Sequence, residues 1–380
     1  MMKILKKISL LVAIVILFSC SVNCSQKKEV ESLTKDLGNV KNIKNVILLI
    51  GDGMGPNQIR AGELFKGEKL YMQGFPHKIT VDTTSLTGVT DSAAAATALA
   101  TGTLTVNGFV GKDLSGKDLE TIVDIAKNKG KSTGVITTEE LYGATPMSFS
   151  GHASSRSDTN TLIESAAKTS GVDLFASFTI DNSLQEVFTS NGYAKIENVD
   201  NISLATAEKV FGSYTICASA ESMSAHPGDV AFDRVLTESL DYLSKDENGF
   251  FIMAEGAHID HGGHNNDIYY MLRELLAFDD AVKAAVEWAS NRNDTVVLVT
   301  ADHETGGLLL RGEVTSDNMF EKNEYGQYEH IFWSTTGHTS MYVDFYLNGV
   351  DIDFTPYLYE SSDCIKNTSV FEIVKSLIIG

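Results

Sequence analysis

The sequence predicts an α/β protein with a largely parallel central sheet and helices on both faces. Three observations predict this class. Short apolar runs typical of strands alternate with longer runs of helical periodicity, which is the pattern of βαβ units. The 380 residues are 43% hydrophobic, which is enough to bury a large core. The chain shows no internal repeat and no low-complexity linker, so one domain is favoured over two.

The expected elements follow one another in that alternation. Strands are predicted at 45–50, 132–137, 172–176, 214–217, 249–254, 295–300 and 341–347. Helices are predicted at 119–129, 159–169, 229–244, 267–291 and 369–379. Two excursions interrupt the pattern, one over 51–118 and one over 305–340, the second a loop or hairpin. Long segments of this kind are uncommon unless functional, so we expect both to build a site.

The first residues differ from the rest of the chain. Lys3, Lys6 and Lys7 precede an apolar run over residues 8–18. This run is shorter than the roughly 20 residues of a membrane span, but it suits a secretory signal. A buried hydrophobic helix would not explain the lysines in front of it. We therefore expect a signal peptide over residues 1–19.

The junction LFSC, residues 17–20, resembles a bacterial lipobox. Lipid on Cys20 would make the protein an exported, membrane-anchored lipoprotein that faces the periplasm or the cell surface. Phe18 is not the commonest residue at its position, so a soluble periplasmic or secreted product is the alternative. Behind the junction we expect a polar tether over 20–42 and a single domain over 43–380.

The chain is strongly acidic. Its formal net charge is −20, and removal of residues 1–19, with three lysines and no acid, takes it to −23. Such a surface argues against a nucleic-acid partner and repels phosphate groups at long range. Any chemistry on phosphate therefore needs concentrated local positive charge, such as metal ions.

The four cysteines do not follow the spacing of a zinc site. Cys217 and Cys364 could pair in an oxidising compartment, but the sequence cannot place them together. Their pairing therefore stays open at this point.

Residues typical of metal ligands follow three of the predicted strands. Ligands bind at the carboxyl ends of strands in open α/β sheets, and mixed nitrogen and oxygen donors suit Zn²⁺ whereas oxygen alone suits Mg²⁺. A single acid after a strand is usually a loop cap, but three such clusters favour a site. Gly262 and Gly263 favour a shaped loop over a helix between the ligands of the second cluster. The three clusters are VILLIGDGMG with Asp52; FFIMAEGAHIDHGGH with Glu255, Asp260, His261 and His264; and VVLVTADHE with Asp302, His303 and Glu304.

The stretch TDSAAAATALATG, residues 90–102, allows two interpretations on its own. Thr90 to Ser92 could simply cap a helix that packs closely through its alanines. Alternatively, the small residues bury a helix N-terminus beneath an anion and hold Ser92 there as a nucleophile.

Seven blocks, in order, resemble the alkaline phosphatase family. The resemblance covers most of the chain after the predicted signal, and so many blocks in the right order are highly specific. It implies an alkaline phosphatase-like α/β/α sandwich that hydrolyses small phosphate monoesters. The blocks are GDGMG at 51–55, TDSAAAATA at 90–98, ATP at 144–146, Arg156, EGAHIDHGGH at 255–264, TADHETGG at 300–307 and GHT at 337–339.

The resemblance also implies roles for the residues that bind and attack the phosphate. Ser92 is the expected nucleophile and forms a phosphoserine that water hydrolyses. Arg156 is expected to hold two phosphate oxygens, and Asp91 either starts the helix or pairs with Arg156. His261 either reaches the phosphate through water or caps its loop.

The resemblance implies two Zn²⁺ ions and one Mg²⁺ ion. The first zinc would activate the water, and the second would lower the pKa of Ser92. Their expected ligands are Asp260, His264 and His338 for the first zinc; Asp52, Ser92, Asp302 and His303 for the second; and Asp52, Thr145 and Glu255 for magnesium.

The chain departs from the best-known bacterial form of the family at two positions. Gly143 stands where that form has an aspartate that orients magnesium-bound water, and His261 stands where it has a lysine. Since Gly143 offers no side chain, we expect weak magnesium retention and activity that rises with added Mg²⁺. Many family members are homodimers, so a homodimer is expected by resemblance only.

Two other classes of function remain alternatives. A sulfatase is disfavoured because no cysteine lies in a Cys-x-Pro-x-Arg stretch, and phosphodiesterase relatives generally lack the pair of Thr145 and Glu255. A phosphate-binding or adhesive protein without turnover is disfavoured because Ser92, Arg156 and all expected metal ligands are present. Ordinary surface or core roles are expected for His152, His226, His258 and His330.

Overall fold

The apolar run NVILLIG forms strand β1 (Asn45–Gly51), whose seven residues are all buried in the central sheet. The computed structural model describes residues 42–217, 230–359 and 362–380. Strands β9 (Phe250–Gly256) and β10 (Thr295–Thr300) flank β1 as parallel neighbours and are equally buried. Strands covered by helices on both faces need no polar side, which explains their continuous apolar sequences.

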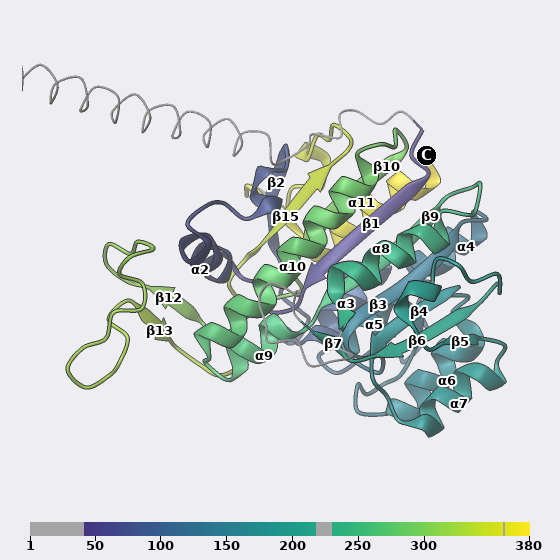
Figure 1. Ribbon diagram of the computed structural model, residues 1–380, viewed down its shortest axis with the longest axis horizontal. Coiled ribbons are helices and arrows are strands. Elements are labelled where there is room, and N and C mark those ends of the chain that lie inside the picture. Colours follow the sequence, from purple (N-terminus) through teal and green to yellow (C-terminus); the bar gives the residue numbers. More distant parts are fainter. Residues whose placement is uncertain (1–41, 218–229, 360–361) are drawn as a thin grey trace, which may run out of the picture. The chain divides into compact units, whose positions relative to one another are not determined.

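The central sheet has ten strands, and in the described part of the chain β15 alone runs against the others. The sequence-based prediction of a largely parallel sheet is confirmed (Figure 1). From one edge to the other the order is β16 (Cys364–Lys366), β2 (His77–Asp82), β15 (Val343–Asn348), β10, β1, β9, β3 (Ser132–Glu140), β4 (Leu174–Phe178), β6 (Val210–Tyr214) and β5 (Ala194–Ile196).

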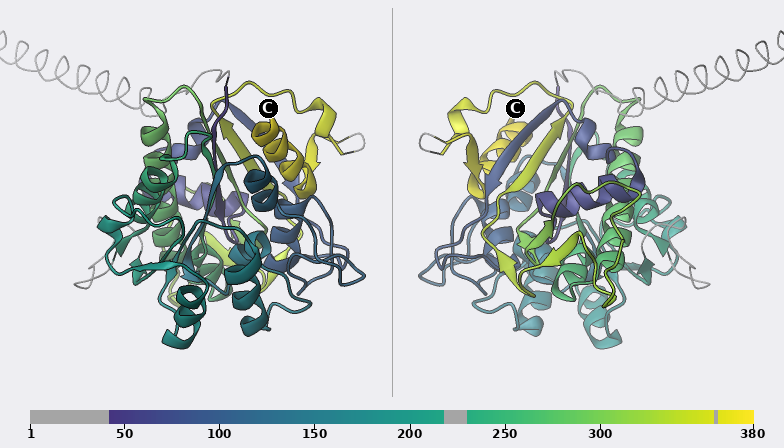
Figure 2. Two further views of the ribbon diagram at one scale, coloured as in Figure 1. Left: turned by 90° about the vertical axis from the view of Figure 1, so that its right-hand side faces the viewer. Right: turned by 90° about the vertical axis from the view of Figure 1, so that its left-hand side faces the viewer.

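Helices cover both faces of this sheet, as the sequence predicts. Figure 2 shows the two groups on opposite sides of the strands. One group is α2 (Pro56–Lys66), α8 (Phe232–Leu243) and α10 (Ile268–Ala289). The other is α3 (Ser92–Thr101), α4 (Ile122–Asn128), α5 (Ala144–Ser150) and α11 (Asn367–Ile379). Helix α6 (Thr159–Thr169) packs on α5, and α7 (Asn182–Ser190) packs on α6.

The two excursions carry more regular structure than a loop. The first holds α2, the short helix η1 (Tyr71–Gly74), β2 and α3. The second is a hairpin, one of the two predicted alternatives. Its strand β12 (Leu308–Leu310) is antiparallel to β13 (Ile331–Trp333), and β11 (Glu304–Thr305) is antiparallel to β14 (His338–Thr339). The remaining short elements are β7 (Ile216–Cys217), β8 (Val230–Ala231), η2 (Val199–Asn201) and η3 (Thr355–Tyr357).

Several features expected at the N-terminus lie outside the described residues. These are the signal peptide, the lipid site at Cys20 and all but the last residue of the tether; His226 is also outside them. Among the described residues, no helix combines the length and hydropathy that a bilayer crossing requires. Cys364 is buried and forms no disulfide with a described side chain, but the side chain of Cys217 is outside the described part, so their pairing stays open.

Candidate functional site

The carboxyl ends of three neighbouring strands bring the predicted ligands to one edge of the sheet. Asp52 directly follows β1, Glu255 is the residue before the last in β9, and the pair Asp302–His303 follows β10. The strands are adjacent and parallel, so residues that are about 250 positions apart in the chain end side by side. His338 comes from β14. This strand pairs with β11, which follows Asp302–His303 in the sequence.

Residues 258–264 form helix α9 (His258–His264), so the predicted loop was wrong. The two glycines allow neighbouring backbone to approach the helix closely, and they do not form a turn. A Cβ atom on Gly262 would lie 2.5 Å from the backbone nitrogen of Met271, and one on Gly263 would lie 2.9 Å from the Thr305 carbonyl oxygen. The helix places Asp260 and His264 one turn apart on the same face, with His264 Nε2 3.2 Å from Asp260 Oδ2.

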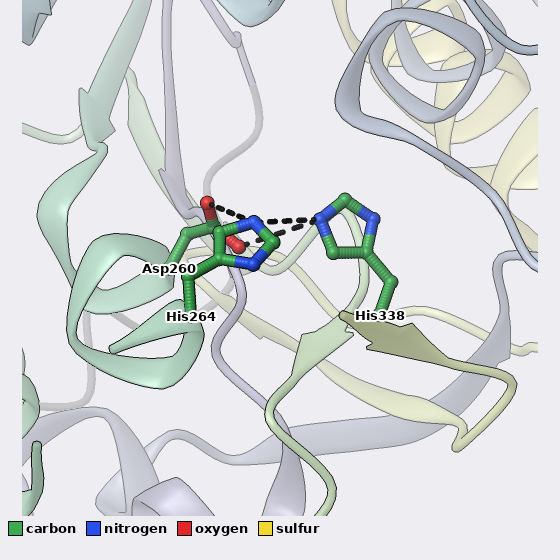
Figure 3. A group of neighbouring side chains, drawn as sticks. All are labelled: Asp260, His264 and His338. Carbon is green, nitrogen blue, oxygen red and sulfur yellow. Dashed lines mark hydrogen bonds and ion pairs between the residues drawn. The ribbon is translucent and has the colours of Figure 1, made fainter. Parts of the chain in front are cut away.

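Asp260, His264 and His338 form the first ligand cluster (Figure 3). The Nε2 atoms of the two histidines lie 3.2 Å apart, and His338 Nε2 is 3.6 Å from Asp260 Oδ1. Hydrogen bonds to the backbone fix the orientation of both rings. His264 Nδ1 donates to the Thr336 carbonyl at 2.5 Å, and His338 Nδ1 donates to the Thr90 carbonyl at 2.8 Å. The Nε2 lone pairs therefore face each other and the carboxylate, which is the mixed donor set that Zn²⁺ favours.

Asp52, Asp302 and His303 form the second cluster, with one ligand atom from each within 4.8 Å of the others. His303 Nε2 lies 3.1 Å from Asp302 Oδ2 and 3.6 Å from Asp52 Oδ1. Asp302 Oδ1 accepts from the backbone N–H of Gly53 at 3.2 Å and of His303 at 2.9 Å. Asp302 Oδ2 and Asp52 Oδ1 are buried with no hydrogen-bond partner among the described residues, as expected of atoms that bind a cation.

Thr305, which sequence reasoning missed, connects the two clusters. Its hydroxyl donates to Asp260 and therefore accepts from His303 Nδ1, at 3.2 Å. This hydrogen bond leaves His303 Nε2 without a proton and turned toward Asp52 and Asp302. The rings of His303 and His338 stack with their centroids 3.6 Å apart, so the clusters are immediate neighbours. The block TADHETGG contains Thr305, but only the contact with Asp260 shows its role.

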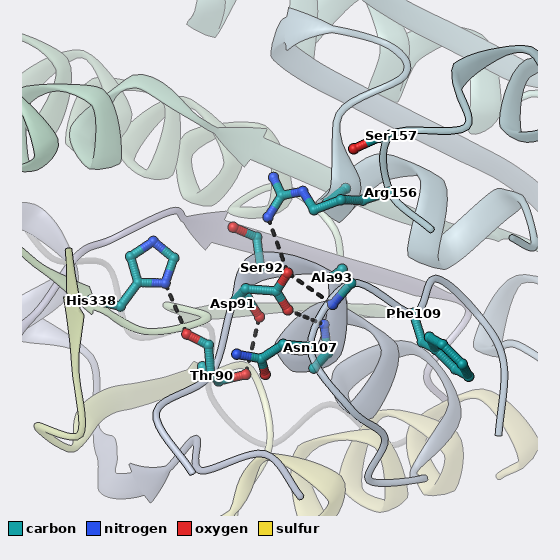
Figure 4. Close-up of polar contacts among 12 residues, drawn as sticks. Thr90, Asp91, Ser92, Ala93, Asn107, Phe109, Arg156, Ser157 and His338 are labelled. Atoms are coloured by element: carbon teal, nitrogen blue, oxygen red, sulfur yellow. Dashed lines mark hydrogen bonds and ion pairs between the residues drawn. The ribbon is translucent and has the colours of Figure 1, made fainter. Parts of the chain in front are cut away.

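Ser92 is the first residue of α3, and its Oγ lies 3.2 Å from His303 Nε2. All ten residues of α3 are buried, since its alanines let it pack closely against α5 and α11. Asp91 is both the helix cap and the partner of Arg156. One of its oxygens accepts from Ala94 N at 3.0 Å and the other lies 3.4 Å from Arg156 Nη1 (Figure 4). The N–H groups that begin α3 and the Arg156 guanidinium thus lie around Ser92.

Thr145, Glu255 and Asp52, the residues expected to hold magnesium, carry only oxygen donors and are called the all-oxygen group here. Thr145 comes from α5, and Glu255 Oε2 accepts from the Thr137 hydroxyl at 2.5 Å. Thr145 Oγ1 and Glu255 Oε1 are buried without a hydrogen-bond partner in the part of the chain that the structure describes. An all-oxygen set with free lone pairs fits Mg²⁺.

The buried carboxylates give the site an excess of negative charge. Burial, followed by the charges of Asp302 and Asp260, raises the pKa of Asp52, and burial followed by Asp260 raises the pKa of Asp302 to about 7. Burial and then the charge of Glu139 raise the pKa of Glu255. Carboxylates packed in this way ionise only when cations balance them. The electrostatics therefore favour bound cations beside Asp52, Asp302 and Glu255.

Glu304 also follows β10, but its carboxylate has a structural role. Oε1 accepts from Gln58 Nε2 at 2.7 Å and from Leu308 N at 3.1 Å, and Oε2 accepts from Gly307 N at 3.2 Å and from the Thr339 hydroxyl. With all these donors, Glu304 ties α2 to the excursion that carries His338.

His152, His258, His261 and His330 do not belong to the two ligand clusters. His261 is on α9, where its ring centroid is 4.8 Å from that of His258, so its role toward a phosphate stays a prediction. His152 Nε2 lies 2.9 Å from the Leu119 carbonyl, and His330 Nδ1 lies 2.9 Å from the Arg311 carbonyl. Burial lowers the pKa of His258 to about 4. These contacts agree with ordinary structural roles for His152, His258 and His330.

The fold and the site together define an α/β protein with a candidate metal centre beside a serine at a helix N-terminus. The family model for alkaline phosphatase matches residues 43–205 and 227–316. The chain belongs to the alkaline phosphatase family, as its sequence motifs predicted.

Individual relatives agree with this assignment. The chain is 32% identical over 304 residues to Alkaline phosphatase 3 of Bacillus subtilis, a match that covers 74% of this chain and 65% of that protein, just under two thirds of its length. It is 30% identical over 347 residues to the alkaline phosphatase of Escherichia coli, with 73% and 74% covered. The solved structure of alkaline phosphatase from the Antarctic bacterium TAB5 superimposes with a TM-score of 0.75 at 29% identity, over 90% of this chain and 99% of that one.

Proposed function

We propose that the protein is an alkaline phosphatase that hydrolyses phosphate monoesters to an alcohol and inorganic phosphate through a phosphoserine on Ser92. The observation that carries the proposal is the place of the Ser92 hydroxyl, buried at the start of α3 and 3.2 Å from His303 Nε2. A hydroxyl beside two clusters of metal-type ligands is positioned for nucleophilic attack. The family of the chain supports the same chemistry.

The residues of the chain fulfil distinct tasks in this reaction. Ser92 Oγ forms a bond to phosphorus while the ester P–O bond breaks and the alcohol leaves. Water then attacks the phosphoserine, its P–Oγ bond breaks, and phosphate is released. The N–H groups at the start of α3 and the Arg156 guanidinium bind the phosphate oxygens, and Asp91 orients that guanidinium. Since the uncatalysed hydrolysis of monoesters is extremely slow, such positioning has to be accompanied by charge neutralisation.

Three cation sites would provide that neutralisation. Bound Zn²⁺ and Mg²⁺ supply positive charge to the phosphate and lower the pKa of the attacking hydroxyl and water. The unpartnered oxygens of Asp52, Asp302, Thr145 and Glu255 support the assignment, as does the structure of a mutant TAB5 alkaline phosphatase with bound Mg. Asp260, His264 and His338 would hold one zinc; Asp52, Asp302 and His303, together with Ser92, the other; and Asp52, Thr145 and Glu255 the magnesium.

Hydrolysis of p-nitrophenyl phosphate, measured together with the metal content of the purified protein, tests the proposal. We expect the wild type to turn over this monoester, and Ser92→Ala to lose activity by on the order of 10³-fold or more while it keeps its zinc. Ser150→Ala is a matched control, since Ser150 is equally buried and its hydroxyl donates to the Pro146 carbonyl, at 2.8 Å. Full activity of Ser92→Ala would refute the phosphoserine route.

Two further measurements separate the alternative functions. Faster cleavage of bis(p-nitrophenyl) phosphate than of the monoester would identify a phosphodiesterase. Binding of phosphate by a metal-loaded wild type that cleaves neither ester would identify a binding protein.

We also propose that the protein is exported and anchored by lipid on Cys20. The lysine-flanked apolar run and the LFSC junction support this proposal, and metabolic labelling with palmitate tests it. A homodimer is proposed from family resemblance, and light scattering tests it. The acidic composition supports small phosphate esters, and not nucleic acid, as partners.

A further inference from the structure

Gly143 is the N-cap residue of α5, two residues before Thr145. Its φ of −53° is accessible to any residue, so the backbone does not require glycine here. A Cβ atom on Gly143 would nevertheless lie 1.8 Å from Glu139 Oε1 and 2.5 Å from Glu139 Cδ. The Glu139 carboxylate therefore occupies the volume that a side chain at position 143 would enter.

A bulge in β3 turns Glu139 to this place. β3 pairs with β9 as far as Thr137, which lies opposite Glu255. On its other side the register with β4 shifts, since Ile136 is paired with Ala176 but Glu140 is paired with Phe178. Between these two pairs, β3 thus has two more residues than β4. Such bulges bend a strand and redirect its side chains, and this one lies directly beyond the Thr137–Glu255 contact.

Backbone contacts place Glu139 next to Glu255. The Glu139 N–H donates to Thr137 Oγ1 at 3.2 Å, and the same Thr137 hydroxyl donates to Glu255 Oε2 at 2.5 Å. Glu139 is therefore linked through one hydroxyl to the all-oxygen group, while its carboxylate lies beside Gly143 at the start of α5.

Three oxygens of this group are buried without hydrogen-bond partners among the described residues. They are Thr145 Oγ1 and Glu255 Oε1, from fully buried residues, and Asp52 Oδ1, from a residue that is 6% exposed. We propose that Glu139 supplies a carboxylate ligand to a cation at this group, in place of the side chain that position 143 lacks. The inference rests on the proposed function, and the four oxygen-bearing residues together form a set that selects Mg²⁺ over Zn²⁺.

This assignment reverses the expectation of weak magnesium binding. That expectation treated Gly143 as a missing side chain with nothing in its place. With the Glu139 carboxylate in that volume, the site has the same kind of donor from another part of the chain. We therefore expect the wild type to retain Mg²⁺.

Calorimetric titration with Mg²⁺ tests the proposal without any turnover. The full chain is stripped with a chelator, reloaded with Zn²⁺ alone and titrated with MgCl₂. We expect Glu139→Gln to bind Mg²⁺ on the order of 10- to 100-fold more weakly than the wild type, with an unchanged zinc content. Glu140→Gln, which removes the same charge from the neighbouring residue, is the matched control and is expected to bind as the wild type does. Wild-type affinity in Glu139→Gln, or an equal loss in Glu140→Gln, would overturn the proposal.

A transfer of the carboxylate gives a second, independent test. Glu139→Ala clears the volume beside Gly143, and the double variant Glu139→Ala/Gly143→Asp returns a carboxylate to it from the other side. We expect Glu139→Ala to lose Mg²⁺ affinity and the double variant to recover most of it. A purely structural role of Glu139 predicts no recovery, so its absence would count against the assignment.

These outcomes are separate from the test of the proposed function. Ser92→Ala removes turnover but leaves the all-oxygen group intact, so its Mg²⁺ affinity should match that of the wild type. If the wild type hydrolyses no monoester, the calorimetric comparison still decides whether Glu139 binds the cation. If Ser92 proves to be the nucleophile and Glu139→Gln binds Mg²⁺ normally, only the further inference fails.

Discussion

Loss of the Thr305 hydroxyl should weaken both ligand clusters at once. The hydroxyl donates to Asp260 in the first cluster and accepts from His303 Nδ1 in the second. Thr305 is fully buried, so neither partner can turn to water when the hydroxyl is absent. Thr305→Val keeps the shape of the side chain and replaces the hydroxyl by a methyl group.

The contacts set the size of the effect. A buried polar group left without its partner costs about 1–3 kcal/mol, and removal of a residue that orients a metal ligand typically weakens binding about 10- to 100-fold. At about 1.4 kcal/mol per factor of ten, the two ranges agree. Since Asp260 and His303 belong to different clusters, we expect each zinc to bind about 10- to 100-fold more weakly in Thr305→Val.

Competition with a chromophoric chelator measures the two zinc affinities in turn. Thr305→Ser keeps a hydroxyl and should restore most of the affinity. Thr300→Val is the matched control, since Thr300 is equally buried and its hydroxyl donates to the Ala301 and Asp344 carbonyls, at 3.3 Å and 3.2 Å. The argument is wrong if Thr305→Val binds zinc within twofold of the wild type, or if Thr300→Val weakens it equally.

Two further predictions concern stability. Gly262→Ala places a Cβ 2.5 Å from the backbone of Met271, so α9 and α10 must separate; we expect a loss of about 1–3 kcal/mol in urea unfolding, and an unchanged midpoint would contradict this. In the metal-free protein, the hydrogen bond to Asp260 raises the pKa of His264 to about 9, and burial raises the pKa of Glu139 to about 8. Between roughly pH 6.5 and 8 both groups bind more protons when folded than when unfolded, so the free energy of unfolding should fall as the pH rises. Urea titrations across that window check the sign, and a rise would refute it.

The sequence predicted the parts of the fold that are buried on both sides. β1, β9 and β10 are continuous apolar runs because helices cover both faces of the sheet, and the residues at their ends meet for the same reason. The missed elements carry weaker local patterns. β5 has only three residues, and α5 combines Pro146 with two serines and depends on its packing against α3. Tertiary contacts, and not local propensity, stabilise such elements.

The wrong loop prediction at residues 258–264 and the expectation of weak magnesium binding rest on the same kind of residue. A glycine indicates either conformational freedom or lack of space, and the sequence alone does not say which. Gly262 was taken as a sign of a loop, yet the Met271 backbone opposite it requires a residue without a side chain inside a helix. Gly143 was taken as the loss of a magnesium-site side chain, and the Glu139 carboxylate, which lies where that side chain would start, is the replacement that we propose. That carboxylate reaches Gly143 only because β3 shifts its register against β4, and a register between strands is a property of two distant segments. A glycine in a metal-binding segment therefore becomes informative only once the group that occupies the space beside it is known.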